Sequence, residues 1–427
     1  MPERAHNDKL QRALRVLIIG IGAVTVLVQW VSTMLTPHGD FTRHWEFGRR
    51  FVHGEFLYSG GLNIPYPPFF AMVYAPLSLL PLQIAKPILF VFGFSSLIAI
   101  LWILDRLTDR ELKIRSEDRL WIIAGTLFIC SRFILRDFDD GGQNLILVAL
   151  AWAAIYLWSQ NRDLLAGASL GFAVAIKCTP AIFIAYFAWK RQWKIVGLAL
   201  IFAAGFTITP AIWQKSSYGI HMREWVQNVV HGVSEADPSV GVLGPEQLQN
   251  KSLRPVLARY LMRLTAGHPG RLESGGYIDF LALSPSAAGL VIKGILLIGM
   301  VTAGWLLRAP VTRDDPAIVW ECAALSLLML LYSPITWGQH CVAAIPAIYL
   351  ILRSFASGRR LPSWAMYLLG AVAAVILIPN RSIIGRNASL LVESYHFVTF
   401  SLIALLILVL YEWHHRFKAA GVQSGKE

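Results

Sequence analysis

Residues Val16 to Thr33 read VLIIGIGAVTVLVQWVST, a stretch without a charged side chain. A helix needs about 20 apolar residues to cross the hydrocarbon core of a bilayer, and fewer where it is broken or buried in protein. The stretch therefore predicts a first transmembrane helix, and comparable apolar runs recur along the chain. We interpret the sequence as one integral membrane domain, residues 1–427, of the all-α polytopic class with about 11–13 transmembrane helices.

The composition supports a membrane protein. Of the 427 residues, 56% are hydrophobic and 15% are charged, whereas soluble domains carry about a quarter charged residues. The formal charge of +12 could suggest nucleic acid. The basic residues lie mainly in short loops between apolar runs, however, which is typical of cytosolic loops. No nucleic-acid partner is therefore expected, and membrane lipid is the expected surroundings.

The basic loops also predict which segments lie outside. Under the positive-inside rule they leave two long outward segments, a first outer loop with interfacial helices at 35–83 and a large outer loop at 214–284. The last apolar run, Leu391–Tyr411, is expected to cross the membrane as one helix. Every polar cluster that could take part in catalysis or binding then falls on one face of the membrane. The sequence thus predicts a multi-pass plasma-membrane protein whose site faces the extracytoplasmic side.

Asp40 is the first candidate functional residue. It lies in the tract GDFTRHW, residues 39–45, directly after the first apolar stretch. A carboxylate held at a membrane surface beside aromatic side chains can take a proton from an acceptor hydroxyl. An aspartate just past a helix end can also be only a cap or a solvated loop residue.

Lys177 is the second candidate. It begins the sequence KCTP between two short apolar runs, Leu164–Ile176 and Ala181–Trp189, which predicts two half-helices joined by a hinge. An ammonium group between such half-helices is costly unless it meets an anion or lines a wet cavity. The hinge could therefore hold a phosphate, although Lys177 could instead extend to the membrane interface.

A third cluster is SPITWGQH, residues 333–340, a polar turn between two apolar runs. Trp337 offers a flat face for a sugar ring, and His340 can donate to a phosphate oxygen or a sugar hydroxyl. A lone histidine in an outer loop is, however, often structural. In the large loop, Asn250 within QNKSL, residues 249–253, could border a groove for an acceptor, but polar loops commonly have this composition.

The fourth cluster follows an acidic tract. Gln143 could bind sugar hydroxyls, and Asn144 could do the same or cap the helix that begins there. The preceding residues Asp137, Asp139 and Asp140 could ligate a divalent cation as oxygen donors. A solvated acidic loop is the favoured interpretation of this tract, and no metal or other cofactor is expected.

Taken in order, these motifs resemble the polyprenyl-phosphate-sugar-dependent GT-C glycosyltransferases of family 87, which include envelope mannosyltransferases and arabinofuranosyltransferases. The sequence departs from the family pattern at Lys251, where the family has glutamine, and at Gln339, where the family has the first of two histidines. The resemblance rests on Asp40 with GEFLY at 54–58, YPP at 66–68, GQN at 142–144, Lys177 with Pro180, Asn250 with Ser252 and Leu253, and Ser333 and Pro334 with Trp337 and His340.

The resemblance implies that Asp40 is the general base and that Lys177 and His340 bind the donor phosphate. The candidates for contacts with the sugar or the acceptor are Tyr66, Gln143, Asn144, Asn250 and Trp337. The implied activity is transfer of a sugar, mannose in the first place, from a polyprenyl-phosphate donor to a lipid or glycan hydroxyl on the outer face. A single base with direct attack gives inversion, because retention needs a second carboxylate as nucleophile.

Two other classes of protein remain open from the sequence. A transporter or flippase of lipid-linked substrates would explain the broken helices and the intramembrane Lys177, but not polar motifs on one face only. A structural or assembly protein would not need the candidate residues to meet. Convergence of Asp40, Lys177 and His340 around one cavity would favour the enzyme.

Overall fold

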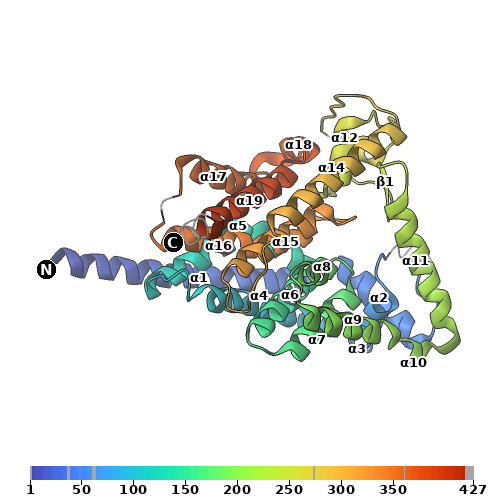
Figure 1. Ribbon diagram of the computed structural model, residues 1–427, viewed down its shortest axis with the longest axis horizontal. Helices are drawn as coiled ribbons and strands as arrows, with labels where there is room; N and C mark the ends of the chain where they lie inside the picture. Colours follow the sequence, from blue (N-terminus) through green and yellow to red (C-terminus); the bar gives the residue numbers. More distant parts are fainter. Residues whose placement is uncertain (1, 36–38, 60–63, 273–274, 360, 419–427) are drawn as a thin grey trace.

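The computed structural model describes residues 2–35, 39–59, 64–272, 275–359 and 361–418, and these are mainly helical with very little strand (Figure 1). The half of the chain before the large loop forms ten helices, namely α1 (Pro2–Leu35), α2 (Asp40–His53), α3 (Pro68–Ser78), α4 (Leu82–Thr108), α5 (Ser116–Asp139), α6 (Gln143–Ser159), α7 (Asp163–Ile176), α8 (Ala181–Trp189), α9 (Trp193–Ile208) and α10 (Ala211–Gln214).

The large loop predicted at 214–284 is built from a short 3-10 helix, helices and one small antiparallel hairpin. Its elements are η1 (Lys215–Ser217), α11 (Tyr218–Ser234), β1 (Val240–Gly241), β2 (Gly244–Pro245), α12 (Leu253–Leu261) and α13 (Pro269–Leu272). In Figure 1, α11 runs from α10, in the lower group of helices, up to the region of β1 and α12. The rest of the described chain contains α14 (Pro285–Leu306), α15 (Ala317–Tyr332), the 3-10 helix η2 (Gly338–Ala344), α16 (Ile345–Ala356), α17 (Ser363–Leu377), α18 (Arg381–Ser394), α19 (Phe397–Trp413) and the π-helix η3 (His414–Lys418).

Six stretches of the described chain are long and apolar enough to cross a membrane, and α5 with α6, bent by 115°, would make a seventh. Four further apolar helices, α3, α7, α15 and α17, are shorter than 18 residues. The predicted all-α multi-pass membrane protein is confirmed, while the count of crossings depends on these short helices and stays a prediction. The six stretches are Ala13–Leu35, Leu82–Thr108, Trp193–Val229, Pro285–Leu306, Gly338–Ala356 and Phe397–Phe417.

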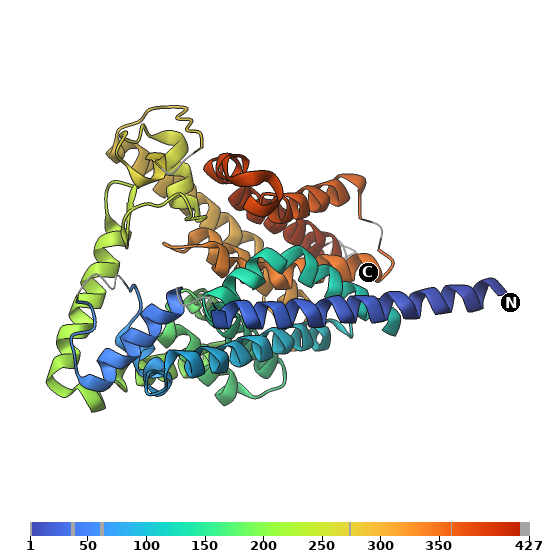
Figure 2. The ribbon, with the colours of Figure 1, turned by 180° about the vertical axis from the view of Figure 1, so that it is seen from behind.

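The apolar surface of α1 fits lipid rather than water. Only 6% of the most apolar 18-residue stretch of α1 is buried inside the protein. Figure 2 shows the helix extending along the molecule beyond its neighbours. Large side chains such as Leu17, Ile19 and Val24 are more than half exposed. A contiguous apolar face of this kind is stable when hydrocarbon surrounds it.

The two predicted half-helices are confirmed, since α7 and α8 end and begin on either side of the hinge. The prediction of one helix over Leu391–Tyr411 is wrong. The chain breaks between α18 and α19, where His396 has a φ of 50°, a left-handed conformation that no continuing α-helix contains. The apolar pattern alone does not record this break.

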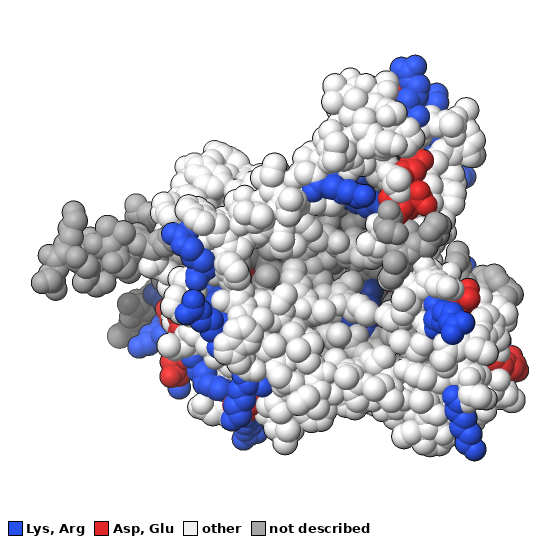
Figure 3. All heavy atoms as spheres, turned by 45° about the vertical axis from the view of Figure 1, so that its right-hand side comes forward, with Lys and Arg blue, Asp and Glu red and all other residues white. Residues whose placement is uncertain are grey.

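Loops that the charge pattern assigns to the cytosol meet at one end of the molecule. Arg110 pairs with Asp314 at 3.4 Å, Arg313 with Asp163 at 2.7 Å, and Arg353 contacts the loop after α4 through Asp109. Figure 3 shows one group of basic side chains at the lower left of the molecule, with further basic side chains on the upper lobe and on the right-hand side. The pairs therefore join loops that are far apart in the sequence into one basic face.

A cluster of buried hydrophobic side chains holds α2 and α3 against α6 and α7. The α2–α3 contact is close, because a Cβ on Gly48 would lie 2.6 Å from the Tyr74 carbonyl carbon. This packing places the helix that begins at Asp40 near the hinge that carries Lys177.

Replacing Gly171 by alanine is expected to destabilise the protein. The new Cβ would lie 2.7 Å from the Ala203 nitrogen and from the Phe202 Cβ on α9, so α7 and α9 would have to separate. Gly197→Ala on α9 is the matched control, because its Cβ meets nothing within 4 Å while the gain in helix propensity is the same. Thermal unfolding in detergent should place Gly171→Ala about 1–3 kcal/mol below the control, and equal stabilities would contradict the close packing.

Candidate active site

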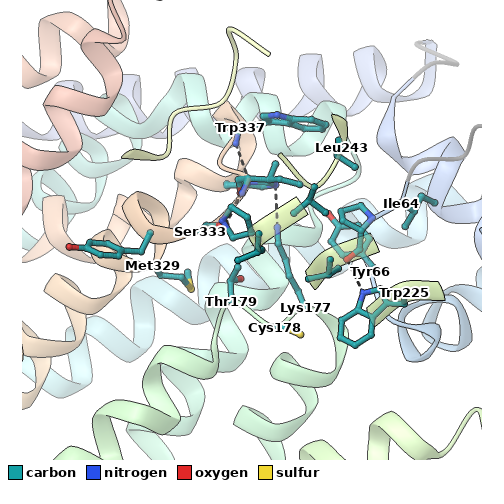
Figure 4. A pocket seen from close by; sticks show the side chains of 18 of the residues that line it. Ile64, Tyr66, Lys177, Cys178, Thr179, Trp225, Leu243, Met329, Ser333 and Trp337 are labelled. Carbon is teal, nitrogen blue, oxygen red and sulfur yellow. Dashed lines mark hydrogen bonds between the residues drawn. The ribbon is translucent and has the colours of Figure 1, made fainter. Parts of the chain in front are cut away.

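A cavity of about 440 Å³ opens between α2, the α7–α8 hinge, α11 and the turn at 333–337 (Figure 4). Five of the eight predicted site residues line it, although they come from four separate segments of the chain. These are Asp40, Tyr66, Lys177, Trp337 and His340. The structure thus brings the predicted base and the predicted phosphate-binding residues together, while their roles in catalysis are not tested by their positions.

Lys177 points into this cavity. It follows the last residue of α7 in an extended conformation, with φ −152° and ψ 123°, so its side chain leaves the helical direction. Its Nζ lies 3.2 Å from His340 Nε2 and donates to Asn144 Oδ1 at 3.4 Å. It also lies 5.6 Å from the centre of the Tyr66 ring, a cation–π distance. The contacts favour the cavity over the interfacial alternative.

Contacts on both ring nitrogens hold the His340 side chain in place. An ammonium group can only donate, so Nε2 accepts from Lys177. Nδ1 lies 3.1 Å from the Trp337 nitrogen and 3.2 Å from the Ile335 carbonyl. In this arrangement His340 orients Lys177, and the ammonium is the group that offers free N–H bonds to an anion.

Asp40 is the first residue inside α2 and not its N-cap, which is Gly39. Its Oδ2 accepts a hydrogen bond from Gln339 Nε2 at 3.2 Å. Because Gln339 is 3% exposed, this amide holds the carboxylate in one orientation inside the cavity. Sequence reasoning did not select Gln339, and its place beside His340 in the same turn was the available signal.

The acidic tract is buried, so its interpretation as a solvated loop is wrong. Asp137 is fully buried and accepts from Asn144 Nδ2 at 2.8 Å and from the Leu145 nitrogen at 3.0 Å. The cause is the start of α6 at this point, since the first N–H groups of a helix need acceptors. Asp139 accepts from Gln29 of α1 at 2.7 Å, and Asp140 is 4% exposed. The described residues contain no group of three potential metal ligands, and the metal requirement stays a prediction.

Gln143 and Asn144 lie behind the wall of the cavity. Gln143 accepts from the Tyr74 hydroxyl at 2.9 Å and donates to the Tyr66 hydroxyl at 3.4 Å. Asn144 connects Asp137 to Lys177 through its side-chain amide. Both residues therefore support groups that face the cavity, and a direct contact with a sugar stays a prediction for each.

Asn250 lies outside the cavity and holds the turn before Trp337. Its Oδ1 accepts from the Thr336 nitrogen at 2.9 Å, and its Nδ2 donates to the Pro334 carbonyl at 2.9 Å and to Glu246 at 2.9 Å. With 1% exposure, it has no free face for a ligand. Its predicted contact with the acceptor is not favoured by this placement, and its evident role is to position the turn.

Burial sets the electrostatics around the cavity. It raises the pKa of Glu246 to about 7, although the hydrogen bond from Asn250 opposes the shift. It lowers the pKa of His44 to about 3, and the nearby charges of Lys177 and Arg43 act in the same direction. His44, which lines the cavity, is therefore neutral at physiological pH.

The fold and the site define a class, a multi-pass membrane enzyme with a cavity that ends in a carboxylate and an ammonium group. The chain belongs to Glycosyltransferase family 87, whose profile matches residues 64–334, and it is a membrane glycosyltransferase. The sequence-based family assignment is confirmed.

The chain is similar to three individual proteins. It is 26% identical over 353 residues to the polyprenol-phosphate-mannose-dependent alpha-(1-2)-phosphatidylinositol mannoside mannosyltransferase of Mycobacterium tuberculosis, covering 77% of this chain and 74% of that protein. It is 28% identical over 389 residues to the corresponding pentamannoside mannosyltransferase of Mycolicibacterium smegmatis, covering 86% and 84%. The crystal structure of apo ArnT from Cupriavidus metallidurans gives a TM-score of 0.42 at 13% identity, over 94% of this chain and 77% of that one.

Proposed function

We propose that this glycosyltransferase moves a mannosyl residue from a polyprenyl-phosphate donor to a hydroxyl group of a membrane glycolipid. The observation that carries the proposal is the convergence of Asp40, Lys177 and His340 on one cavity. The names of the two mycobacterial relatives support mannose as the sugar and a phosphatidylinositol mannoside as the type of acceptor. A transporter of lipid-linked substrates is not favoured, because the family consists of glycosyltransferases.

In the proposed reaction, the donor, the acceptor and the residues of the cavity account for every bond that forms or breaks and for the proton that moves. The acceptor oxygen attacks the anomeric carbon, and its proton passes to the Asp40 carboxylate. The bond from the anomeric carbon to the phosphate oxygen breaks, and its electron pair leaves with the polyprenyl phosphate. Lys177 stabilises the negative charge that develops on that phosphate. Since the leaving group is already a phosphate, no strong general acid is required.

The single carboxylate of the cavity supports inversion at the anomeric carbon. Asp40 is the only carboxylate among the described residues that line it. A retaining enzyme would need a second carboxylate as nucleophile, with the two carboxyl groups about 5–5.5 Å apart. A β-linked donor would accordingly give an α-linked product.

The rest of the cavity suits an isoprenoid chain. Away from Asp40 and Lys177 it is lined by apolar side chains of α11, α14 and α15, among them Val229, Met300 and Met329. A tail placed there would keep the phosphate at the polar end.

The assay that tests the proposal supplies membranes containing the protein with a panel of labelled polyprenyl-phosphate sugars. Transfer from the mannose donor into lipid, undiminished by a chelator, is expected. Membranes that use only nucleotide sugars, or transfer nothing above membranes lacking the protein, would contradict the proposed function.

The proposed outward orientation of the site gives a labelling prediction. Arg263 in the large loop and Arg110 in the basic face are both exposed, with side-chain exposures of 71% and 87%. In a cysteine-free background, Arg263→Cys should react with a membrane-impermeant maleimide on intact cells, and Arg110→Cys only after permeabilisation. Labelling of both positions from the same side would refute the topology.

A further inference from the structure

The three arginines of α2 differ in what they face. Arg49 pairs with Glu46 at 2.7 Å and with Glu55 at 3.0 Å, and Arg50 pairs with Glu46 at 3.2 Å. Arg43 is exposed and lines the cavity, and it makes no hydrogen bond or ion pair with any residue that the structure describes. Its guanidinium therefore keeps five N–H donors available inside a substrate cavity.

Arg43 lies on the side of the cavity where the acceptor hydroxyl would meet Asp40. It follows Asp40 by three residues on the same helix, so both side chains lie on one face with Cβ atoms about 5–6 Å apart. The proposed acceptor hydroxyl must contact Asp40 to lose its proton. Lys177, by contrast, reaches the cavity from the α7–α8 hinge and is oriented by His340. Two cationic groups thus stand on different walls, one for the leaving phosphate and one beside the attacking hydroxyl.

We propose that Arg43 is an anion-binding residue for the acceptor, and that it takes a phosphodiester of the acceptor headgroup. The proposal rests on the proposed function and specifies its acceptor. A guanidinium fork binds a phosphate through two parallel hydrogen bonds, which an unpaired exposed arginine can offer.

The spacing also limits the size of the acceptor. The distance of about 5–6 Å between positions three apart on a helix is comparable with one sugar ring. A phosphodiester bound by Arg43 would lie on the same wall of the cavity as the reacting hydroxyl. This arrangement favours acceptors whose phosphate is close to the growing sugar over mannosides whose growing end is far from it.

The test compares acceptors and variants in one steady-state assay with polyprenyl-phosphate mannose as donor. The anionic acceptor is a phosphatidylinositol monomannoside, and the neutral one is an octyl mannoside. Wild-type protein should prefer the anionic acceptor. Arg43→Gln should raise the KM for it by roughly 10- to 100-fold, the size of effect expected for a lost charged hydrogen bond, with turnover of the neutral acceptor and the KM for the donor unchanged.

Two variants complete the design. Arg49→Gln removes a charge from the same helix outside the cavity and should leave the KM and turnover of both acceptors unaffected. Arg43→Lys keeps the charge without the fork and should retain part of the preference. Retained turnover of the octyl mannoside shows that each variant is folded.

Three results would overturn the inference. The wild-type protein could use the neutral acceptor as well as the anionic one. Arg43→Gln could leave the preference intact. It could also raise the KM for the donor alone, which would assign Arg43 to the donor phosphate. None of these is the failure of the proposed function itself, which would be wild-type protein that transfers no mannose from the polyprenyl donor to either acceptor.

Discussion

Asp40→Asn is expected to lower turnover by about 10²–10⁴-fold, the usual contribution of a positioned general base. The asparagine keeps the shape of the side chain, and its oxygen can still accept the hydrogen bond from Gln339. Only the ability to take the acceptor proton is lost. The variant is therefore sharper than alanine, because it separates the base from the structural roles of the same position.

The binding step offers an independent readout. Cys178 is exposed in the hinge beside Lys177, whereas the other three cysteines are buried. Bound donor should protect Cys178 from alkylation equally in the wild-type protein and in Asp40→Asn. Asp139→Asn is the matched control, since it removes a carboxylate that contacts Gln29 outside the cavity, and its turnover should be near normal. Near-normal transfer by Asp40→Asn would remove the residue from the mechanism.

Lys177→Ala is expected to lower kcat/KM for the donor by about 10²–10³-fold, the usual cost of removing one group that stabilises developing negative charge. The substitution also deprives His340 and Asn144 of their common partner. Donor protection of Cys178 should weaken as well, which distinguishes this variant from Asp40→Asn. Lys177→Arg should be partly active, because a planar fork does not replace a point charge.

The control for Lys177 is Lys293→Ala on α14, an exposed lysine outside the cavity, which should transfer mannose normally. If Lys177→Ala matched this control in both turnover and donor protection, the ammonium would have no part in binding the phosphate.

The sequence was sufficient for features that depend on local pattern. Apolar runs located most helices, and the KCTP hinge was correctly placed because proline and a charged residue interrupt an apolar stretch. Lys177 could be selected because an ammonium group between two apolar half-helices is costly. Asp40 and His340 could be selected as groups suited to proton transfer and phosphate binding in the predicted outer segments, together with the family resemblance.

Features that depend on where a side chain meets its partners in the folded protein could not be predicted. Asp137 looked solvated because nothing in the sequence shows that its carboxylate meets the first N–H groups of α6. Asn250 looked like a ligand-binding residue until its partners at 334–336 were known. Gln339 acquires its importance only through Asp40, which is 299 positions away. For Asn250 and Gln339 the deciding contact joins segments far apart in the sequence. For Asp137 the partner is close in the sequence, but the turn that brings the carboxylate back to the start of α6 is not visible in the pattern.

The most direct test of the central claim is a structure of Asp40→Asn with bound polyprenyl-phosphate mannose. The account predicts the phosphate within hydrogen-bond distance of Lys177, the anomeric carbon facing position 40, and the isoprenoid chain along Met300 and Met329. A donor whose phosphate lies away from Lys177, or whose anomeric carbon faces away from position 40, would contradict it.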